Sequence, residues 1–64
     1  MKFYKLDQTY YKVNGNNIER VSAYKHYQSV SVTVTSQFGT DEMTEITEAQ
    51  FTRVKRLILA KICQ

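Results

Sequence analysis

The chain has few of the residues that stabilise small secreted proteins or build metal and nucleotide sites. Its 64 residues include one cysteine (Cys63), one histidine, two glycines and no proline. A single cysteine excludes an intramolecular disulfide framework and favours a reducing compartment, so we expect a cytoplasmic protein. One cysteine and one histidine fall short of the four ligands of a structural zinc site, and two glycines are too few for a phosphate-binding loop. We therefore expect no metal and no cofactor.

Long hydrophobic runs are also missing. The longest apolar run, Leu57–Ala60, is far shorter than the roughly 20 residues that span a bilayer. Charged residues occupy the N-terminal positions where a secretory leader would be apolar. The sequence predicts neither a membrane span nor a leader.

The length predicts one domain over residues 1–64 with a small core, because a chain of this size buries only about 60% of its unfolded surface. Oligomerisation is a common way to stabilise such a domain without disulfides or metals. A catalytic pocket needs supported groups that exclude water, and the chain has little room for one. His26 lies between Lys25 and Tyr27 with no evident carboxylate or nucleophile partner. We expect no enzyme, no small-molecule substrate and a homo-oligomer.

The period of the hydrophobic pattern changes along the chain. Residues 28–36, QSVSVTVTS, alternate apolar and hydroxyl side chains, which places three valines on one face of a strand. Residues 47–63 have helical spacing, which places an apolar stripe along a helix. A one-sided strand and a one-sided helix bury their apolar faces by covering each other. The valines are Val30, Val32 and Val34, and the stripe is Phe51, Val54, Ile58 and Ile62.

A hairpin is predicted early in the chain. Asn-Gly at positions 14 and 15 is the strongest short hairpin signal, and it leaves two registers open. A two-residue loop pairs Tyr11 with Ile18, whereas a four-residue loop pairs Val13 with Ile18. Both registers put these three side chains on one face, because they differ by two positions. A break or bulge in the preceding strand is expected near Asp7–Gln8.

A reversal is predicted within residues 22–29. Residues 18–36 in one extended strand would span roughly 60 Å, whereas a compact domain of this size has a radius of gyration of about 11 Å. The apolar positions also change from odd to even numbers in this segment, and a turn would restore one apolar face. A short helix over Ile18–Tyr27 capped by Asn17 is the alternative.

The helix start carries a capping box. Thr47-Glu48-Ala49-Gln50 places Thr47 at the N-cap and Gln50 at the third helical position, and Ile46 and Phe51 are spaced to form a hydrophobic staple. The predicted fold class is α+β, a small antiparallel β-sheet of three to four strands in the order β-β-β-(β)-α, with one C-terminal helix packed across one face. The predicted strands lie within 2–13, 18–27 and 29–36, a further strand is allowed within 42–46, and the helix covers 48–62.

A small sheet followed by a C-terminal helix in a short, basic chain resembles the arm-site DNA-binding domains of some phage and transposon integrases. The resemblance lies in the inferred topology, and no residue motif carries it. It implies DNA binding as an expectation based on analogy. The length is also common among accessory proteins of phages and mobile elements.

The first functional prediction is a small non-enzymatic protein-binding or accessory module that associates with itself or with a protein partner. The uncharged strand of residues 28–36 is a poor sheet edge unless another chain covers it. Two leucines widen the apolar surface of the helix beyond its stripe. The residues expected to bind protein are Val30, Val32, Val34, Leu57 and Leu59.

Nucleic-acid binding is the alternative. The formal charge is +3, and four of the six acids fall within residues 41–48, so the remaining surface is basic. Tyrosines and cations interleave in the strands, as they do in proteins that bind single-stranded nucleic acid. Tyrosines also favour strands and cover thin cores, which accounts for them without a ligand. The residues expected to bind nucleic acid are Tyr10, Lys12, Arg20, Tyr24, Lys25 and Tyr27.

Overall fold

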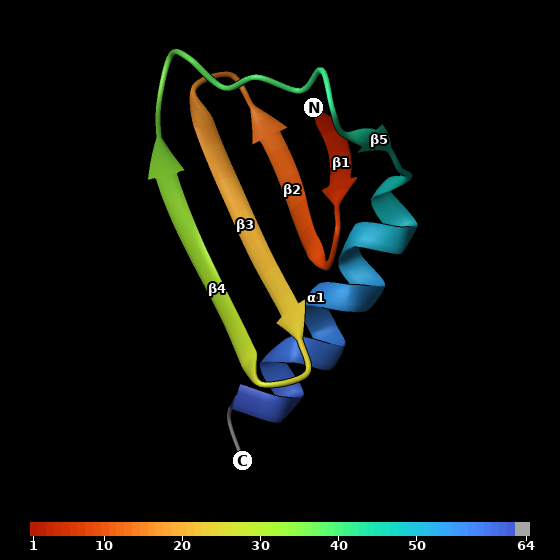
Figure 1. Cartoon of the computed structure of the whole chain (residues 1–64). Coiled ribbons are helices and arrows are strands. Elements are labelled where there is room, and N and C mark those ends of the chain that lie inside the picture. Colours follow the sequence, from red (N-terminus) through yellow and green to blue (C-terminus); the bar gives the residue numbers. More distant parts are fainter. Residues whose placement is uncertain (63–64) are drawn as a thin grey trace.

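The computed structural model describes residues 1–62, which form an antiparallel sheet of five strands with one helix packed against it (Figure 1). The α+β prediction is confirmed. The order across the sheet is β4-β3-β2-β1-β5. Cys63 lies outside the described residues. The elements are β1 (Lys2–Leu6), β2 (Thr9–Asn14), β3 (Asn17–Tyr24), β4 (Tyr27–Val34), β5 (Thr44–Glu45) and α1 (Glu48–Ile62).

The break expected near Asp7–Gln8 is a complete reversal that joins β1 to β2. Leu6 pairs with Thr9 across a two-residue turn. Asp7 has a φ of 54°, and aspartate tolerates this left-handed region because its short polar side chain bonds to the local backbone. The segment therefore forms a hairpin of two paired strands.

The Asn-Gly hairpin joins β2 to β3 in the second of the two predicted registers, with Val13 opposite Ile18. Asn14 and Asn17 also pair, so the turn itself consists of the two residues between them. Gly15 has a φ of 61°, which glycine adopts without the steric cost that a Cβ atom would add. The predicted sharing of one face by Tyr11, Val13 and Ile18 is confirmed.

The reversal expected within residues 22–29 lies at Lys25–His26. A two-residue turn sets odd-numbered residues of β3 opposite even-numbered residues of β4, as in the pair Val21 and Val30. This pairing explains why the apolar positions change from odd to even along the sequence. The alternative of a helix over Ile18–Tyr27 is wrong, because this tyrosine- and valine-rich segment forms a strand and a turn.

The predicted capping box forms at the start of α1. The backbone N–H of Gln50 donates to Thr47 Oγ1 at 3.1 Å, and the backbone N–H of Thr47 donates to Gln50 Oε1 at 2.9 Å. Ile46 and Phe51 belong to one apolar cluster, as a hydrophobic staple requires. The helix covers Glu48–Ile62 as predicted.

Thr47→Ala should lower the free energy of unfolding by about 1 kcal/mol, because the substitution removes the side-chain acceptor of the N-cap. Urea denaturation followed by circular dichroism measures this loss. Thr52→Ala is the matched control inside α1, where alanine is a better helix former than threonine and should not lower stability. Equal losses in the two variants would contradict a capping role.

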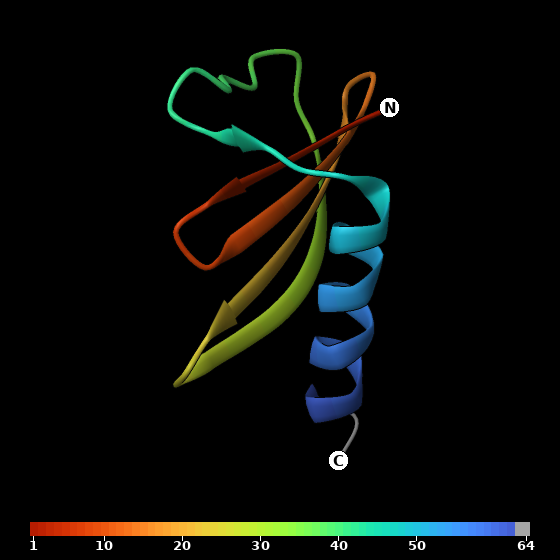
Figure 2. The same cartoon turned by 90° about the vertical axis from the view of Figure 1, so that its right-hand side faces the viewer.

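The main core lies between α1 and one face of the sheet (Figure 2). Val21 is fully buried, and the Phe3 and Phe51 rings lie 5.5 Å apart between centroids. Ile62, the last residue of the predicted stripe, is exposed, so the core ends one turn earlier. The buried residues are Phe3, Val21, Phe51 and Ile58, with Tyr10, Ala23, Val30, Ile46 and Val54 packed around them.

Residues 35–43 cross the opposite face of the sheet on their way from β4 to β5 (Figure 2). The Phe38 ring lies 5.2 Å from the Tyr11 ring, and Ile18, which lies on that face, is 1% exposed. A second, smaller apolar region therefore covers part of the face that α1 leaves open. No helix within residues 1–62 has the length and apolarity to cross a membrane.

Candidate functional site

The two edges of the sheet differ in length and charge. β5 forms one edge with two residues, one of them Glu45. β4 forms the other edge with eight residues, none charged and none proline. Within the described chain no strand pairs with the outer side of β4. Natural sheets protect their edges with short strands, charges or proline, and β4 has none of these.

The backbone of β4 has free hydrogen-bonding groups on its outer side. The backbone N–H of Thr35, just beyond the strand, donates to the carbonyl of Asn16 at 2.8 Å and continues the pairing with β3. In an antiparallel strand the N–H and C=O groups of alternate residues point to opposite neighbours. Odd-numbered residues of β4 therefore bond to β3. The residues that direct backbone groups outward are Gln28, Val30, Val32 and Val34.

The valines of β4 lie on the same face as α1 but are unequally covered. Val30 is half-buried against the core, whereas Val32 is 67% exposed and Val34 is 73% exposed. Their exposure shows that α1, although it packs against β4, leaves the later part of this strand open. An apolar strip therefore accompanies the free backbone edge.

One side of α1 continues this strip. Lys55 forms an ion pair with Glu19 of β3, so this side of the helix faces the part of the sheet that contains β3 and β4. Leu59 and Ile62 follow on the same side, because residues four and seven positions apart share a helix face. Both side chains are exposed. The predicted site residue Leu59 therefore lies beside the β4 edge.

Leu57 lies on the other side of α1. It lines a groove of about 360 Å³ between the helix and the β1–β2 hairpin, together with Lys5 and Tyr10. The structure does not bring it together with the valines of β4. In the sequence, Leu57 and Leu59 look alike, because both lie outside the apolar stripe of the helix. The direction in which α1 crosses the sheet places Leu59 near β4 and Leu57 on the other side of the helix.

The residues predicted to bind nucleic acid are divided between the two faces. Tyr10 and Lys12 lie on the α1 side of the sheet, whereas Arg20, Tyr24 and Tyr27 lie on the opposite side. Lys25 is in the β3–β4 turn. Two cations, Arg20 of the predicted set and Lys5 outside it, lie near individual rings. The Lys5 ammonium lies 5.4 Å from the Tyr10 centroid, and the Arg20 guanidinium lies 5.7 Å from the Tyr11 centroid.

Residues 1–62 contain no group of three or more histidine, cysteine, aspartate or glutamate side chains that could hold a metal ion. The most distinctive feature of this part of the chain is the long, uncharged β4 edge. A comparison with protein family models, with curated proteins and with solved structures finds no match for this chain.

Proposed function

We propose that this chain is a non-enzymatic protein-binding module that associates with a second copy of itself through the outer edge of β4. The observation that carries the proposal is the eight-residue uncharged edge strand, whose backbone groups and exposed valines have no partner within residues 1–62. Pairing with another strand satisfies those groups, which is the basis of binding by strand addition.

The pattern of β4 is complementary to itself. A two-fold axis perpendicular to the sheet pairs the two strands antiparallel, and directly opposed side chains then lie on the same face. The α1 side of the paired strands then consists of valines and Gln28, and the opposite side consists of serines, a threonine and Tyr27. Because β4 has no charged residue, no like charges are brought together. These properties favour a second copy over an unrelated partner.

Apolar side chains at the edge add to the backbone pairing. The partner strand would cover Val32 and Val34, and the partner helix approaches from the same face, where Leu59 and Ile62 are exposed. Full burial of one such side chain contributes about 1.5–3 kcal/mol. A few of them, partly buried, help to offset the freedom that two chains lose on association.

Association through β4 should stop at two copies. The dimer would present β5 and the ends of β1 that it leaves uncovered at its outer edges, and β5 is short and contains Glu45. Lys2 forms an ion pair with Glu45 at 3.6 Å, which adds a second charge at this edge. Short, charged edges resist further strand addition. The assembly is therefore a closed dimer with one continuous sheet.

Sedimentation velocity of the purified chain tests the proposal. The wild type should sediment as a dimer at high micromolar concentration, and Val32→Lys should sediment as a monomer because two lysines would approach each other near the two-fold axis. Leu57→Lys is the matched control, since it places the same charge at an exposed apolar position on the far side of α1. A monomeric wild type would overturn the proposal. Monomers from Leu57→Lys alone would move the interface to that side of the helix.

A further inference from the structure

The charges of the chain are divided unevenly between its two faces. The α1 side, by which we mean the helix and the sheet face that it covers, carries six cations and two acids, a formal charge of +4. The acids are Glu19 and Glu48, and Glu19 forms an ion pair with Lys55. The opposite side, including the loop that crosses it, carries Lys2 and Arg20 with three acids. The cations of the α1 side are Lys5, Lys12, Arg53, Lys55, Arg56 and Lys61.

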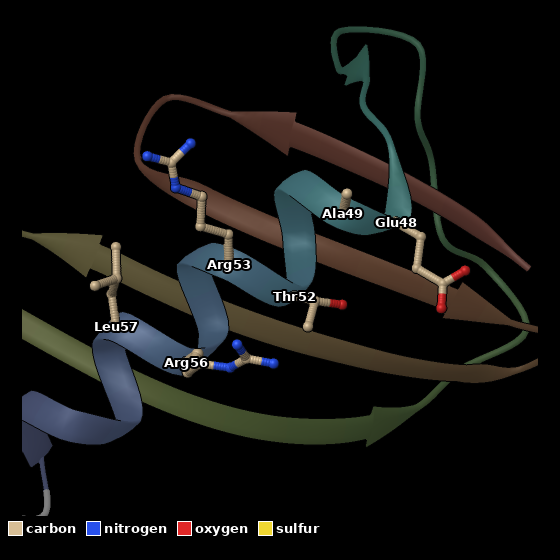
Figure 3. A pocket seen from close by; sticks show the side chains of 6 residues that line it. All are labelled: Glu48, Ala49, Thr52, Arg53, Arg56 and Leu57. Carbon is tan, nitrogen blue, oxygen red and sulfur yellow. The ribbon is translucent and has the colours of Figure 1, made fainter.

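Two of these cations, Arg53 and Arg56, lie on the outward face of α1. Figure 3 shows Arg53 and Arg56 extending from the helix surface, with the small side chains of Ala49 and Thr52 beside them. Neither arginine forms an ion pair within the described part of the chain. The small side chains of Ala49 and Thr52 let a large anion approach the helix backbone closely, and Glu48 is the acid that lines the same surface.

We propose that the α1 side of this protein binds duplex nucleic acid through the phosphate backbone. A duplex carries one negative charge per about 1.7 Å of its axis, and cations that neutralise phosphates release condensed counterions. Arginine and threonine are common phosphate contacts, and such contacts position a protein without reading the sequence. The surface needs no base-reading side chains for this mode of binding.

A duplex fits this face better than a single strand. Binding of single strands depends on aromatic rings that stack on bases, but Tyr11, Tyr24 and Tyr27 lie on the opposite face of the sheet. Tyr10 lies on the α1 side, but its ring packs against the core. The six cations of the α1 side and the exposed rings of Tyr24 and Tyr27 therefore lie on opposite faces of the sheet.

A membrane surface fits this face poorly. A helix that lies on a membrane directs an apolar face toward the lipid. In α1 the apolar stripe, with Phe51 and Ile58 buried, is turned toward the sheet. The outward face carries Arg53 and Arg56 beside small or polar side chains and one exposed leucine, Leu57, which is too little apolar surface to insert into lipid.

The proposed dimer would enlarge this surface, and to that extent the inference rests on the proposed function. The two-fold axis perpendicular to the sheet keeps both helices on one face, so the basic sides of the two chains form one surface. Each chain nevertheless carries its own set of cations. Binding by a single chain is therefore expected, with fewer phosphate contacts than the dimer makes.

Fluorescence anisotropy with a labelled duplex of mixed sequence, measured at several salt concentrations, tests the inference. The logarithm of the binding constant should fall linearly with the logarithm of salt concentration, by about 0.9 for each phosphate contact. The double variant Arg53→Gln/Arg56→Gln should reduce this slope by about 2 per chain. The matched control is Lys2→Gln/Arg20→Gln, which removes the same charge from the opposite face and should leave the slope unchanged.

Three results would overturn the inference: equal loss of binding in the two double variants, tighter binding to the single strand than to the duplex, and binding to anionic vesicles without binding to the duplex. Val32→Pro separates the inference from the proposed dimer, because it removes an outward amide of β4 without changing the charge. A monomeric Val32→Pro chain should still bind the duplex with roughly half the salt slope, and its binding should still depend on Arg53 and Arg56. If the wild type is itself monomeric and its duplex binding depends on Arg53 and Arg56, the proposed dimer is excluded and the proposed duplex binding is supported.

Discussion

Phe51→Ala should leave most of the chain unfolded at room temperature. Phe51 is 2% exposed and joins α1 to the sheet through its contact with Phe3. Truncation of a buried phenylalanine costs about 3–5 kcal/mol. In a chain of 64 residues a single hydrophobic core rarely supplies more than about 3–5 kcal/mol of stability. The loss is therefore comparable to the whole stability of the domain.

Urea denaturation and thermal melting, both followed by circular dichroism, measure this effect. All variants need the same protein concentration, because self-association adds to apparent stability. Leu57→Ala is the control on the same helix, where the side chain is 58% exposed and the expected change is within about 0.5 kcal/mol. Similar midpoints for the two variants would show that α1 contributes little to the core.

The elements that the sequence predicts correctly depend on local chemistry. The capping box at Thr47 and the hairpin at Gly15 each involve a few consecutive residues whose side chains or φ angles determine the structure. The reversal within residues 22–29 follows from chain length and from the change of alternation. These features hold in any tertiary arrangement, and the structure has all three.

The features that sequence reasoning missed depend on contacts between distant segments. The cover that Phe38 provides over Tyr11 requires a loop to cross the whole sheet, and no local pattern marks that path. The choice between the two hairpin registers also depends on pairing along the entire strand, since both turns are sterically allowed. The sequence shows that Tyr11 and Ile18 share a face but not that this face lies opposite α1.

The candidate site was predictable only in part for the same reason. The alternation of Val30, Val32 and Val34 predicts one face of a strand, but its place at the edge follows from the strand order. The positions of Leu57 and Leu59 relative to β4 follow from the path of α1 across the sheet. Arg56 gives a weak signal, because a basic residue in the later turns of a helix also complements its dipole.

Proline substitutions at neighbouring positions of β4 should have opposite consequences. Proline lacks a backbone N–H and is tolerated in edge strands where that group would point to solvent. Val32 directs its N–H outward, and its side chain is largely exposed. Val32→Pro should therefore stay folded and lose the ability to dimerise. Thr33 directs its N–H to β3, where it pairs with Ile18.

Thr33→Pro should destabilise the fold by about 1–3 kcal/mol. The substitution removes the N–H that donates to the carbonyl of Ile18, and Ile18 is only 1% exposed. Leaving a buried acceptor without a donor costs about this much free energy. Urea denaturation of both variants measures the stability difference, and sedimentation velocity measures the loss of association. A dimeric Val32→Pro chain would exclude the outer side of β4 as the interface. A Val32→Pro chain that is destabilised as much as Thr33→Pro would mean that the even-numbered amides already have a partner within the monomer. The pair of substitutions separates these cases because the two positions are adjacent in sequence and differ in the direction of one N–H group.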